Sequence, residues 1–365
     1  MTFFRSPLSL LPIALLGGVV GDALPSSLSA QGLFEVAAQA SGTDVLLQAV
    51  SPVDDRTVWI SGHGGTWGLT LDAGAHWSTG VVPGAAELEF RDVEGFSASS
   101  AVLLAAGPGD RSRLYRTDDG GESWTETWVM TEPDGFLDCM DFVDIDDGFA
   151  YGDAINGQLY LLESIDGGRS WSRVGAARLP AALEDEGGFA ASGDCVSTSP
   201  EGAVLVATGN GPTPRLVRSD DNGRSWSVST LPVTAGPSAG ATAIGVENEG
   251  FAWVVGGAIG DPLPGARVAT SSDGGATWTP APDPPVEGPL YGADVSHTSD
   301  RRTLVVVGPG GIAASSNGGA TWQGLHADAH WAIAFAPGGA GWAVGPQGRV
   351  TYLQPLSRPQ PKEPS

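Results

Sequence analysis

The sequence predicts an all-β protein, a single seven-bladed β-propeller built of four-stranded antiparallel blades. Three observations predict this fold: an eight-residue pattern that recurs six times, seven aligned segments typical of inner strands, and the composition. Of 365 residues, 54 are glycine and 12 are tryptophan, and 41% are hydrophobic. Such a composition suits a large core divided by many turns, and a closed all-β fold accommodates this length in one domain.

The repeated pattern is Ser/Thr-x-Asp-x-Gly-x-x-Trp. Its third position falls at Asp72, Asp119, Asp166, Asp221, Asp273 and Asn317, and its eighth at Trp77, Trp124, Trp171, Trp226, Trp278 and Trp322. A period of roughly 45 to 55 residues is typical of propeller blades. We expect each copy to form the turn between the third and fourth strands of a blade. The carboxylate accepts bonds from turn amides, the glycine takes a positive φ, and the tryptophan packs back into the blade. All these residues are therefore expected to be structural.

Seven segments carry a large apolar residue at the same distance before a turn, as inner strands do. They are centred on Val50, Val93, Phe142, Val196, Ile244, Val295 and Phe335. Seven inner strands against six repeats indicate that the last blade lacks its outer hairpin. A lone apolar segment at 33–38 precedes the first repeat, so we expect it to pair with the last three strands and close the ring. Closure removes exposed strand edges and places the propeller at residues 31–355.

The two ends of the chain differ from the repeats. Residues 1–30 combine Arg5, an apolar run at 8–20 and small residues suited to cleavage after Ala23 or Ala30. This layout is typical of a signal peptide and predicts a periplasmic or secreted protein. The Pro-rich tail at 356–365 is expected to be disordered.

Cysteine and charge restrict the class of protein further. Cys139 and Cys195 are the only cysteines, which excludes a disulfide-dense scaffold and a cysteine-based zinc site. Two buried thiols or one bridge both remain open. With 18 Lys+Arg against 42 Asp+Glu, the net charge is −24, which argues against nucleic-acid binding. No nucleotide-binding or HExxH motif is present, so we expect no cofactor; we also expect a monomer.

Three carboxylates occupy equivalent positions on inner strands, at Asp92, Asp141 and Asp294. Carboxylates converging on one axis suit a hard cation such as Ca²⁺. Alternatively, each accepts backbone hydrogen bonds from the neighbouring blade. Their blades are not contiguous, which favours the second interpretation and predicts no metal site.

A candidate interaction face combines charged and aromatic residues that stand at or just before inner strands. Its members are Arg91, Asp138, Glu186, Phe189, His330 and Trp331, together with His63 in a Gly-rich turn. Exposed aromatic side chains beside charges on a rigid ring suit recognition of a protein or a glycan. The alternative is that the same side chains pack the ends of the blades.

The repeats are Asp-box (BNR) repeats, which also occur in sialidase-like propellers. Between them, several stretches resemble the photosystem II stability/assembly factor-like family. They are Ser61–Thr66, Phe90–Val93, Leu114–Gly121, Gly135–Asp138, Phe189–Gly193 and Gly341–Gly348. The likeness spans residues 33–354 and implies a propeller that binds a protein partner during assembly. The family's photosynthetic members bind a membrane-protein precursor through a basic surface, and the acidic balance of this chain departs from that pattern.

The leading hypothesis is therefore a non-enzymatic scaffold that binds a protein partner, with any membrane association made through that partner. The alternative is a carbohydrate-active protein, either glycan-binding or a glycoside hydrolase. A glycosidase needs two nearby carboxylates, for which Asp92, Asp138 and Glu186 are the candidates. A sialidase would also need an arginine triad and a Tyr/Glu pair, which the spacing does not provide. Its Arg-Leu-Pro signature occurs at 178–180, but between blades three and four.

Overall fold

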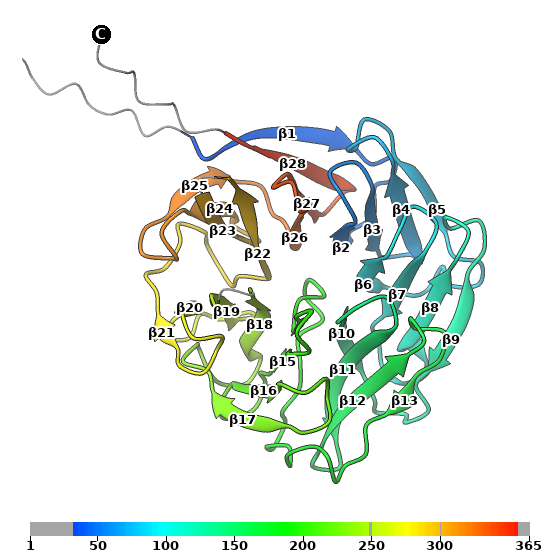
Figure 1. Cartoon of the computed structure of the whole chain (residues 1–365), viewed down its shortest axis with the longest axis vertical. Coiled ribbons are helices and arrows are strands. Elements are labelled where there is room, and N and C mark those ends of the chain that lie inside the picture. Colours follow the sequence, from blue (N-terminus) through cyan, green and yellow to red (C-terminus); the bar gives the residue numbers. More distant parts are fainter. Residues whose placement is uncertain (1–31, 248–249, 300, 357–365) are drawn as a thin grey trace, which may run out of the picture. The chain divides into compact units, whose positions relative to one another are not determined.

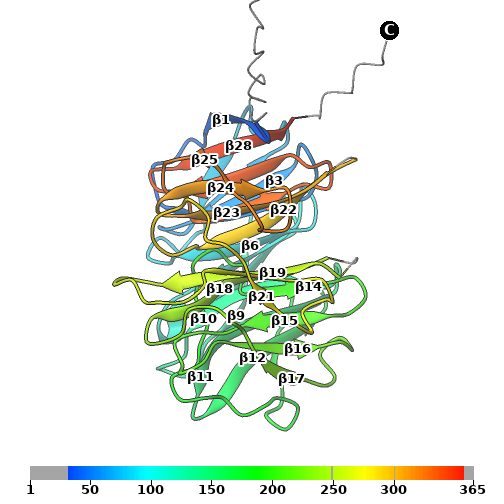
Figure 2. The same ribbon diagram turned by 90° about the vertical axis from the view of Figure 1, so that its left-hand side faces the viewer.

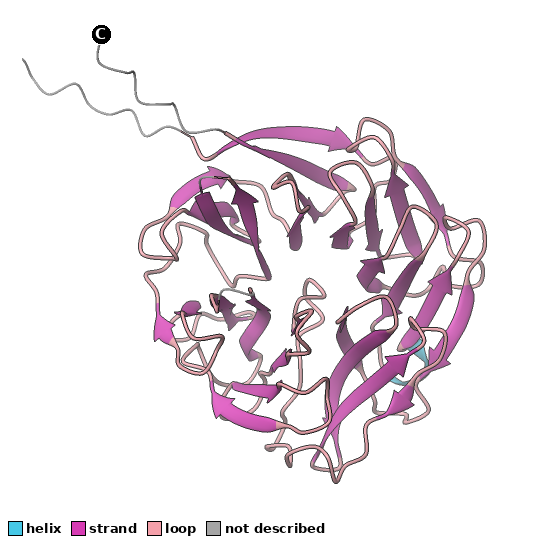
Figure 3. Cartoon of the chain, in the orientation of Figure 1, coloured by secondary structure: helices cyan, strands magenta, loops and turns pink. Residues whose placement is uncertain are grey.

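In a computed structural model, the chain forms seven four-stranded antiparallel sheets arranged as a ring (Figure 1). The structure describes residues 32–247, 250–299 and 301–356. The signal peptide predicted at 1–30 lies outside these residues, and so does the tail predicted at 356–365 except for its first residue, Leu356. Within them, almost everything between the turns is strand, as Figure 3 shows, and no helix is long and apolar enough to cross a membrane. The all-β prediction is confirmed.

Each of the first three blades is continuous in sequence and runs from its inner to its outer strand. Blade 1 contains β2 (Leu47–Pro52), β3 (Val58–Gly62), β4 (Thr66–Thr70) and β5 (Ser78–Val81). Blade 2 contains β6 (Phe90–Gly95), β7 (Ala101–Ala105), β8 (Arg113–Thr117) and β9 (Thr125–Val129), with the 3₁₀ turn η1 (Gly109–Arg111) before β8. Blade 3 contains β10 (Leu137–Phe142), β11 (Asp147–Ile155), β12 (Gln158–Ile165) and β13 (Ser172–Arg173).

The next three blades follow the same order. Blade 4 contains β14 (Val196–Thr198), β15 (Val204–Ala207), β16 (Arg215–Ser219) and β17 (Ser227–Thr230). Blade 5 contains β18 (Ala239–Val246), β19 (Ala252–Ala258), β20 (Val268–Ser271) and β21 (Thr279–Pro280). Blade 6 contains β22 (Gly292–Thr298), β23 (Arg301–Gly308), β24 (Gly311–Ser315) and β25 (Gln323–His326).

Blade 7 joins the two ends of the propeller. It contains β26 (Ala332–Phe335), β27 (Gly341–Gly345), β28 (Arg349–Pro355) and, as its outermost strand, β1 (Phe34–Ala40). The register of β1 against β28 runs from Phe34 opposite Pro355 to Ala40 opposite Arg349. The predicted closure by an N-terminal strand is confirmed.

The six repeats form the turns between third and fourth strands, and their hydrogen bonds are local. In the first repeat, the Thr70 hydroxyl donates to Asp72 Oδ1 (2.9 Å) and accepts the Gly74 N–H (2.9 Å). Asp72 Oδ1 also accepts the His76 N–H (2.8 Å). Gly74 has φ +85°, a conformation that favours glycine. The same hydrogen bonds recur in the other five turns.

The hydrophobic core is divided into seven clusters, and each lies between two neighbouring blades. Between blades 1 and 2, for example, Trp59 of β3 packs with Phe90 of β6, Leu103 of β7 and Tyr115 of β8. The tryptophan of each repeat turn packs into the cluster shared with the preceding blade: Trp124 of blade 2 lies 6.2 Å from Trp59 of blade 1, ring centre to ring centre. The repeat tryptophans therefore stabilise contacts between blades as well as their own blade.

Two features replace or reinforce these contacts where the repeat is interrupted. Blade 7 has no repeat turn, and its interface with blade 6 contains Phe34 of β1 against Phe335 (5.7 Å between ring centres). Cys139 of β10 and Cys195, directly before β14, form a disulfide with their Cα atoms 5.8 Å apart. The bridge joins the inner strands of blades 3 and 4, which settles the alternative that the sequence left open.

Candidate functional site

A loop of eight residues crosses the central channel of the propeller. This central loop, residues 187–194, belongs to the long connection between blades 3 and 4 and is visible inside the ring in Figure 1. The Ser192 hydroxyl donates to the Tyr291 carbonyl of blade 6 (2.8 Å). On the side of blade 5, the Asp194 carbonyl accepts the Ile244 N–H (2.9 Å). The loop thereby links blades far apart in the sequence.

Blades 1 and 2 hold the other side of the central loop. Gln48 Nε2 donates to the carbonyls of Ala190 (3.5 Å) and Ala191 (3.4 Å), and Arg91 Nη1 donates to the Ala190 carbonyl (3.3 Å). Peptide groups withdrawn from water need such partners. Because they come from several blades, the loop is fixed across the whole width of the channel.

Glycine permits this crossing at two close approaches. A Cβ at position 188 would lie 2.6 Å from Asp138 Oδ2, and one at position 193 would lie 2.4 Å from Asp92 Oδ1. Gly193 also has φ +88°, a left-handed conformation in which a side chain is strained. Any larger residue at 188 or 193 would therefore displace the loop.

Two of the predicted site residues are buried beside this loop. Glu186 is 2% exposed, and its carboxylate accepts bonds from Arg215 Nε (2.8 Å), the Thr208 hydroxyl (2.8 Å) and the Leu183 N–H (2.8 Å). Asp138 is also 2% exposed. Burial, together with the nearby Asp153 carboxyl, raises the pKa of Asp138 well above its ordinary value.

The central loop separates two hollows, one on each side. The turns that follow the inner strands lie on the same side of the ring as the repeat turns. In blade 1, Ala73 of the repeat turn donates its N–H to the carbonyl of Arg56, in the turn after the inner strand (2.9 Å). In blade 2, Gly120 donates to Ser99 in the same way (2.8 Å). The channel opens to that side through an acidic hollow. The other hollow, here called the mouth hollow, lies near the starts of the inner strands.

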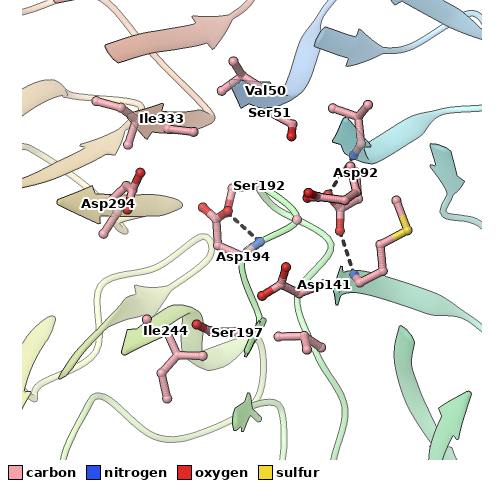
Figure 4. Close-up of a pocket in the computed structure, with 18 of the residues that line it drawn as sticks. Val50, Ser51, Asp92, Asp141, Ser192, Asp194, Ser197, Ile244, Asp294 and Ile333 are labelled. Atoms are coloured by element: carbon pink, nitrogen blue, oxygen red, sulfur yellow. Dashed lines mark hydrogen bonds between the residues drawn. The ribbon is translucent and has the colours of Figure 1, made fainter. Parts of the chain in front are cut away.

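The acidic hollow, shown in Figure 4, has a volume of about 320 Å³ and contains five carboxylates: Asp92, Glu94, Asp141, Asp194 and Asp294. Three of these bridge their blade to the next one. Asp92 accepts the N–H groups of Val93 (2.7 Å) and Met140 (2.6 Å).

The same arrangement recurs at Asp141 in blade 3 and at Asp294 in blade 6. Asp141 accepts the N–H groups of Phe142 (2.7 Å) and Thr198 (2.6 Å), and Asp294 those of Val295 (2.7 Å) and Phe335 (2.7 Å). The interpretation of the three as acceptors of backbone bonds from the neighbouring blade is confirmed. Burial raises the pKa of Asp141 to about 6 and that of Asp294 to about 7. Among the described residues, no group of three or more His, Cys, Asp and Glu could hold a metal ion.

The mouth hollow has a volume of about 260 Å³ and a mixed aromatic and polar lining. It is lined by Leu46, Gln48, His63, Arg91, Phe189, Ala190, Ala191, Ile259, Tyr291 and Trp331. The rings of Tyr291 and Trp331 lie 5.0 Å apart, centre to centre. Neither the Tyr291 hydroxyl nor the Trp331 indole N–H has a hydrogen-bond partner within the described residues, so both are available to a ligand.

Charged groups lie beside the aromatic pair. Arg91 donates from Nε (3.0 Å) and Nη2 (2.6 Å) to Glu89 Oε2, and its side chain is 28% exposed. His63 Nε2 lies 2.5 Å from Gln48 Oε1. Burial lowers the pKa of His63 below its ordinary value, which favours the neutral ring. The hollow thus offers hydrogen-bond donors, aromatic faces and one neutralised cation.

The structure brings four of the seven predicted interaction residues together: His63, Arg91, Phe189 and Trp331 line the mouth hollow. The placement of the other three on an exposed face was wrong. Asp138 is buried against Gly188 of the central loop. Glu186 is buried directly before the loop, where it bonds to Arg215, and His330 is fully buried.

His330 is held inside blade 7. Its Nε2 lies 2.8 Å from the Thr351 hydroxyl and its Nδ1 lies 2.7 Å from the Asp328 carbonyl. Burial lowers the pKa of His330 to about 4. Its neighbour Trp331 reaches the hollow because successive side chains of an extended segment point to opposite sides.

Gln48, Ile259 and Tyr291 are members of the hollow that sequence analysis did not single out. The sequence does contain one signal for the central loop: the spacing between repeats is largest from Asp166 to Asp221. The additional residues in that interval include the loop. No local pattern indicates which blades this loop contacts.

Comparison with known proteins gives the fold. No family model matches the chain, and no curated protein matches it. A structure of YCF48 bound to D1 peptide has a TM-score of 0.61 at 17% identity, covering 90% of this chain and 98% of that one. YCF48 from Cyanidioschyzon merolae has a TM-score of 0.60 at 15% identity, covering 87% and 98%.

Enzymes share the same architecture. A streptogramin B lyase has a TM-score of 0.64 at 16% identity, covering 88% of this chain and 98% of that one. A GH74 xyloglucanase from Xanthomonas campestris has 0.56 at 15% identity, covering 87% and 53%. These neighbours are consistent with the resemblance seen in the sequence. At such identities they show the fold, and function has to be argued from the site.

Proposed function

We propose that this protein is an exported, non-enzymatic scaffold that binds a segment of a protein partner at the mouth hollow, in an assembly or chaperone-like role. The observation that carries the proposal is the aromatic pair Tyr291 and Trp331 with free donor groups, set beside Arg91 on a channel closed by the central loop. Tyrosine, tryptophan and arginine are the residues that most often dominate binding energy at protein interfaces. A propeller of the same fold binds a peptide, which supports this class of function.

The closed channel favours binding over catalysis. A rigid floor keeps the hollow preformed, so a bound segment does not have to order its own site. The carboxylates considered for a glycosidase are engaged elsewhere: Asp92 by two backbone amides, Glu186 by Arg215, and Asp138 by burial beside the central loop. Asp92 lines the acidic hollow, but both of its carboxylate oxygens accept backbone N–H groups. Asp138 and Glu186 are each only 2% exposed.

Glycan binding is the second candidate function, and the Tyr291–Trp331 pair is the observation that favours it. Aromatic faces with nearby donors suit sugar rings as well as peptides. In this case, the same hollow would bind saccharides, and no hydrolysis would be expected.

The test is affinity capture from a cell-envelope extract with the propeller, residues 32–365, as bait. We expect a reproducible partner that Trp331→Ala and Arg91→Ala both lose. Trp128→Ala is the matched control, because Trp128 is a half-buried tryptophan on β9 outside the hollow. Partners retained by Trp331→Ala would contradict the proposed site, and binding to a glycan array that depends on Trp331 would favour the second function.

A further inference from the structure

A third hollow is lined by the residues on either side of Ile259, which itself lines the mouth hollow. This groove, here called the blade 5–6 groove, has a volume of about 640 Å³ and lies between two connections. One wall is the loop 259–266, between β19 and β20, and the other is the segment 283–289, between β21 and β22. Ile259 lines the mouth hollow, while its neighbours Ala258 and Gly260 line the groove. Consecutive residues of one segment therefore line the two hollows.

The wall at 259–266 carries an exposed leucine between two anchored ends. At its start, the Ile259 N–H donates to the Ser238 carbonyl (2.8 Å); at its end, the Ala266 carbonyl accepts the N–H (2.9 Å) and hydroxyl (3.1 Å) of Thr234. Between these anchors, Leu263 is 41% exposed. Ile259, in the same loop, is 39% exposed, and exposed apolar side chains that gather in one place mark interaction sites.

The opposite wall is fixed by Arg267. Its guanidinium donates to the carbonyls of Val286 (2.6 Å), Gly288 (2.6 Å) and Pro284 (3.1 Å). These bonds and the prolines of the wall restrict its backbone, so the groove exists before a ligand arrives. Such preorganisation lowers the cost of binding.

The charge on the rim is acidic. Asp261, Asp283 and Glu287 are exposed there, whereas the one cation, Arg267, is bound to three carbonyls and lies 3.4 Å from Asp283. The whole chain carries a net charge of −24. Two copies of this chain would repel each other at this surface. The surface would also repel nucleic acid and an anionic membrane.

We propose that the blade 5–6 groove binds the continuation of the segment held at the mouth hollow, and that this part of the ligand is an extended polypeptide with an apolar residue against Leu263 and a lysine or arginine at the acidic rim. The proposal rests on the proposed function, since it extends the same site. An extended chain advances about 3.3 Å per residue, so a few residues suffice to pass over Ile259 from one hollow to the other.

The probe is a library of random 12-residue peptides displayed on phage and selected against the immobilised protein. We expect enriched peptides to combine an apolar residue or proline with Lys or Arg. The most enriched peptide, labelled with fluorescein, is then titrated by anisotropy. Leu263→Ser should weaken its binding at least about tenfold, because an apolar contact is lost. Asp261→Lys with Glu287→Lys should weaken it further and reduce its dependence on salt.

Two matched controls lie away from the groove. Leu71→Ser changes a leucine that is 54% exposed in the first repeat turn. Asp110→Lys reverses an acidic side chain that is 79% exposed in blade 2. Both should leave the affinity unchanged.

Each other outcome overturns a defined part of the reasoning. Peptides that depend on Trp331 but not on Leu263 would overturn the groove and leave the proposed function standing. Enriched peptides that are acidic, or that bind more tightly to the charge-reversed variant, would overturn the basic occupant. Selection of no peptide, or of peptides insensitive to both Trp331→Ala and Leu263→Ser, would overturn the groove and the proposed function together.

Discussion

Removing the disulfide between Cys139 and Cys195 should destabilise the propeller measurably. The two cysteines are 56 residues apart in sequence. Cross-linking a loop of that length lowers the entropy of the unfolded chain by about 14 cal/mol/K, which corresponds to about 4 kcal/mol at 25 °C. For a domain of this size, the loss should lower the melting temperature by about 6 °C.

The assay is thermal unfolding of the wild type and of the double variant Cys139→Ala, Cys195→Ala, each with and without a phosphine reductant. Both sulfurs are fully buried, so the wild type is unfolded and refolded in reductant to open the bridge. We expect the refolded, reduced wild type to melt close to the double variant. The double variant itself should not respond to reductant.

Two results would refute the reasoning. A double variant that melts within about 1 °C of the oxidised wild type would show that the bridge does not constrain the unfolded chain as the entropy model requires. An equal response of the double variant to reductant would show that the reagent, and not the bridge, causes the shift.

Two further predictions concern the channel. Gly193→Ala should lower the free energy of unfolding by about 1–3 kcal/mol, because the new Cβ would meet Asp92 and the backbone has a positive φ. The measurement is thermal unfolding, with Gly175→Ala as the control, since a Cβ at position 175 meets nothing within 4 Å. Equal melting temperatures of the two variants would contradict the prediction. Burial raises the pKa of Asp294 to about 7. Between about pH 4 and 7, Asp294 therefore keeps its proton in the folded protein and loses it in the unfolded chain. Its contribution to the free energy of unfolding falls as pH rises, by up to about 1.4 kcal/mol per pH unit. Melting curves from pH 5 to 8 should slope less in Asp294→Asn, and unchanged slopes would exclude Asp294 as a source of the pH dependence.

The fold could be predicted because its evidence is local. Each repeat turn is specified within eight residues by side-chain bonds such as that from Thr70 to Asp72, and the blade count follows from repeated strands. Even the closure by residues 33–38 followed from counting, because a ring leaves one blade incomplete.

The site could be predicted only in part, because its contacts are not local. Trp331 and His330 are neighbours in sequence, yet one lines the mouth hollow and the other is fully buried. A shift of one residue along an extended segment reverses the direction of a side chain, and the spacing of inner strands is not precise enough to assign it. The central loop is harder still, since Ser192 bonds to Tyr291 from another blade.

The two hollows differ in how their polar groups are used, and this difference supports the proposed binding surface. In the acidic hollow, three of the five carboxylates, Asp92, Asp141 and Asp294, each use both oxygens to join adjacent inner strands. Removing such an acceptor would leave buried N–H groups without partners, which costs about 1–3 kcal/mol each. In the mouth hollow, the free Tyr291 hydroxyl and Trp331 indole N–H join no blades. A ligand can bond to them without breaking a contact that the ring requires, which supports that side as the proposed surface for recognition.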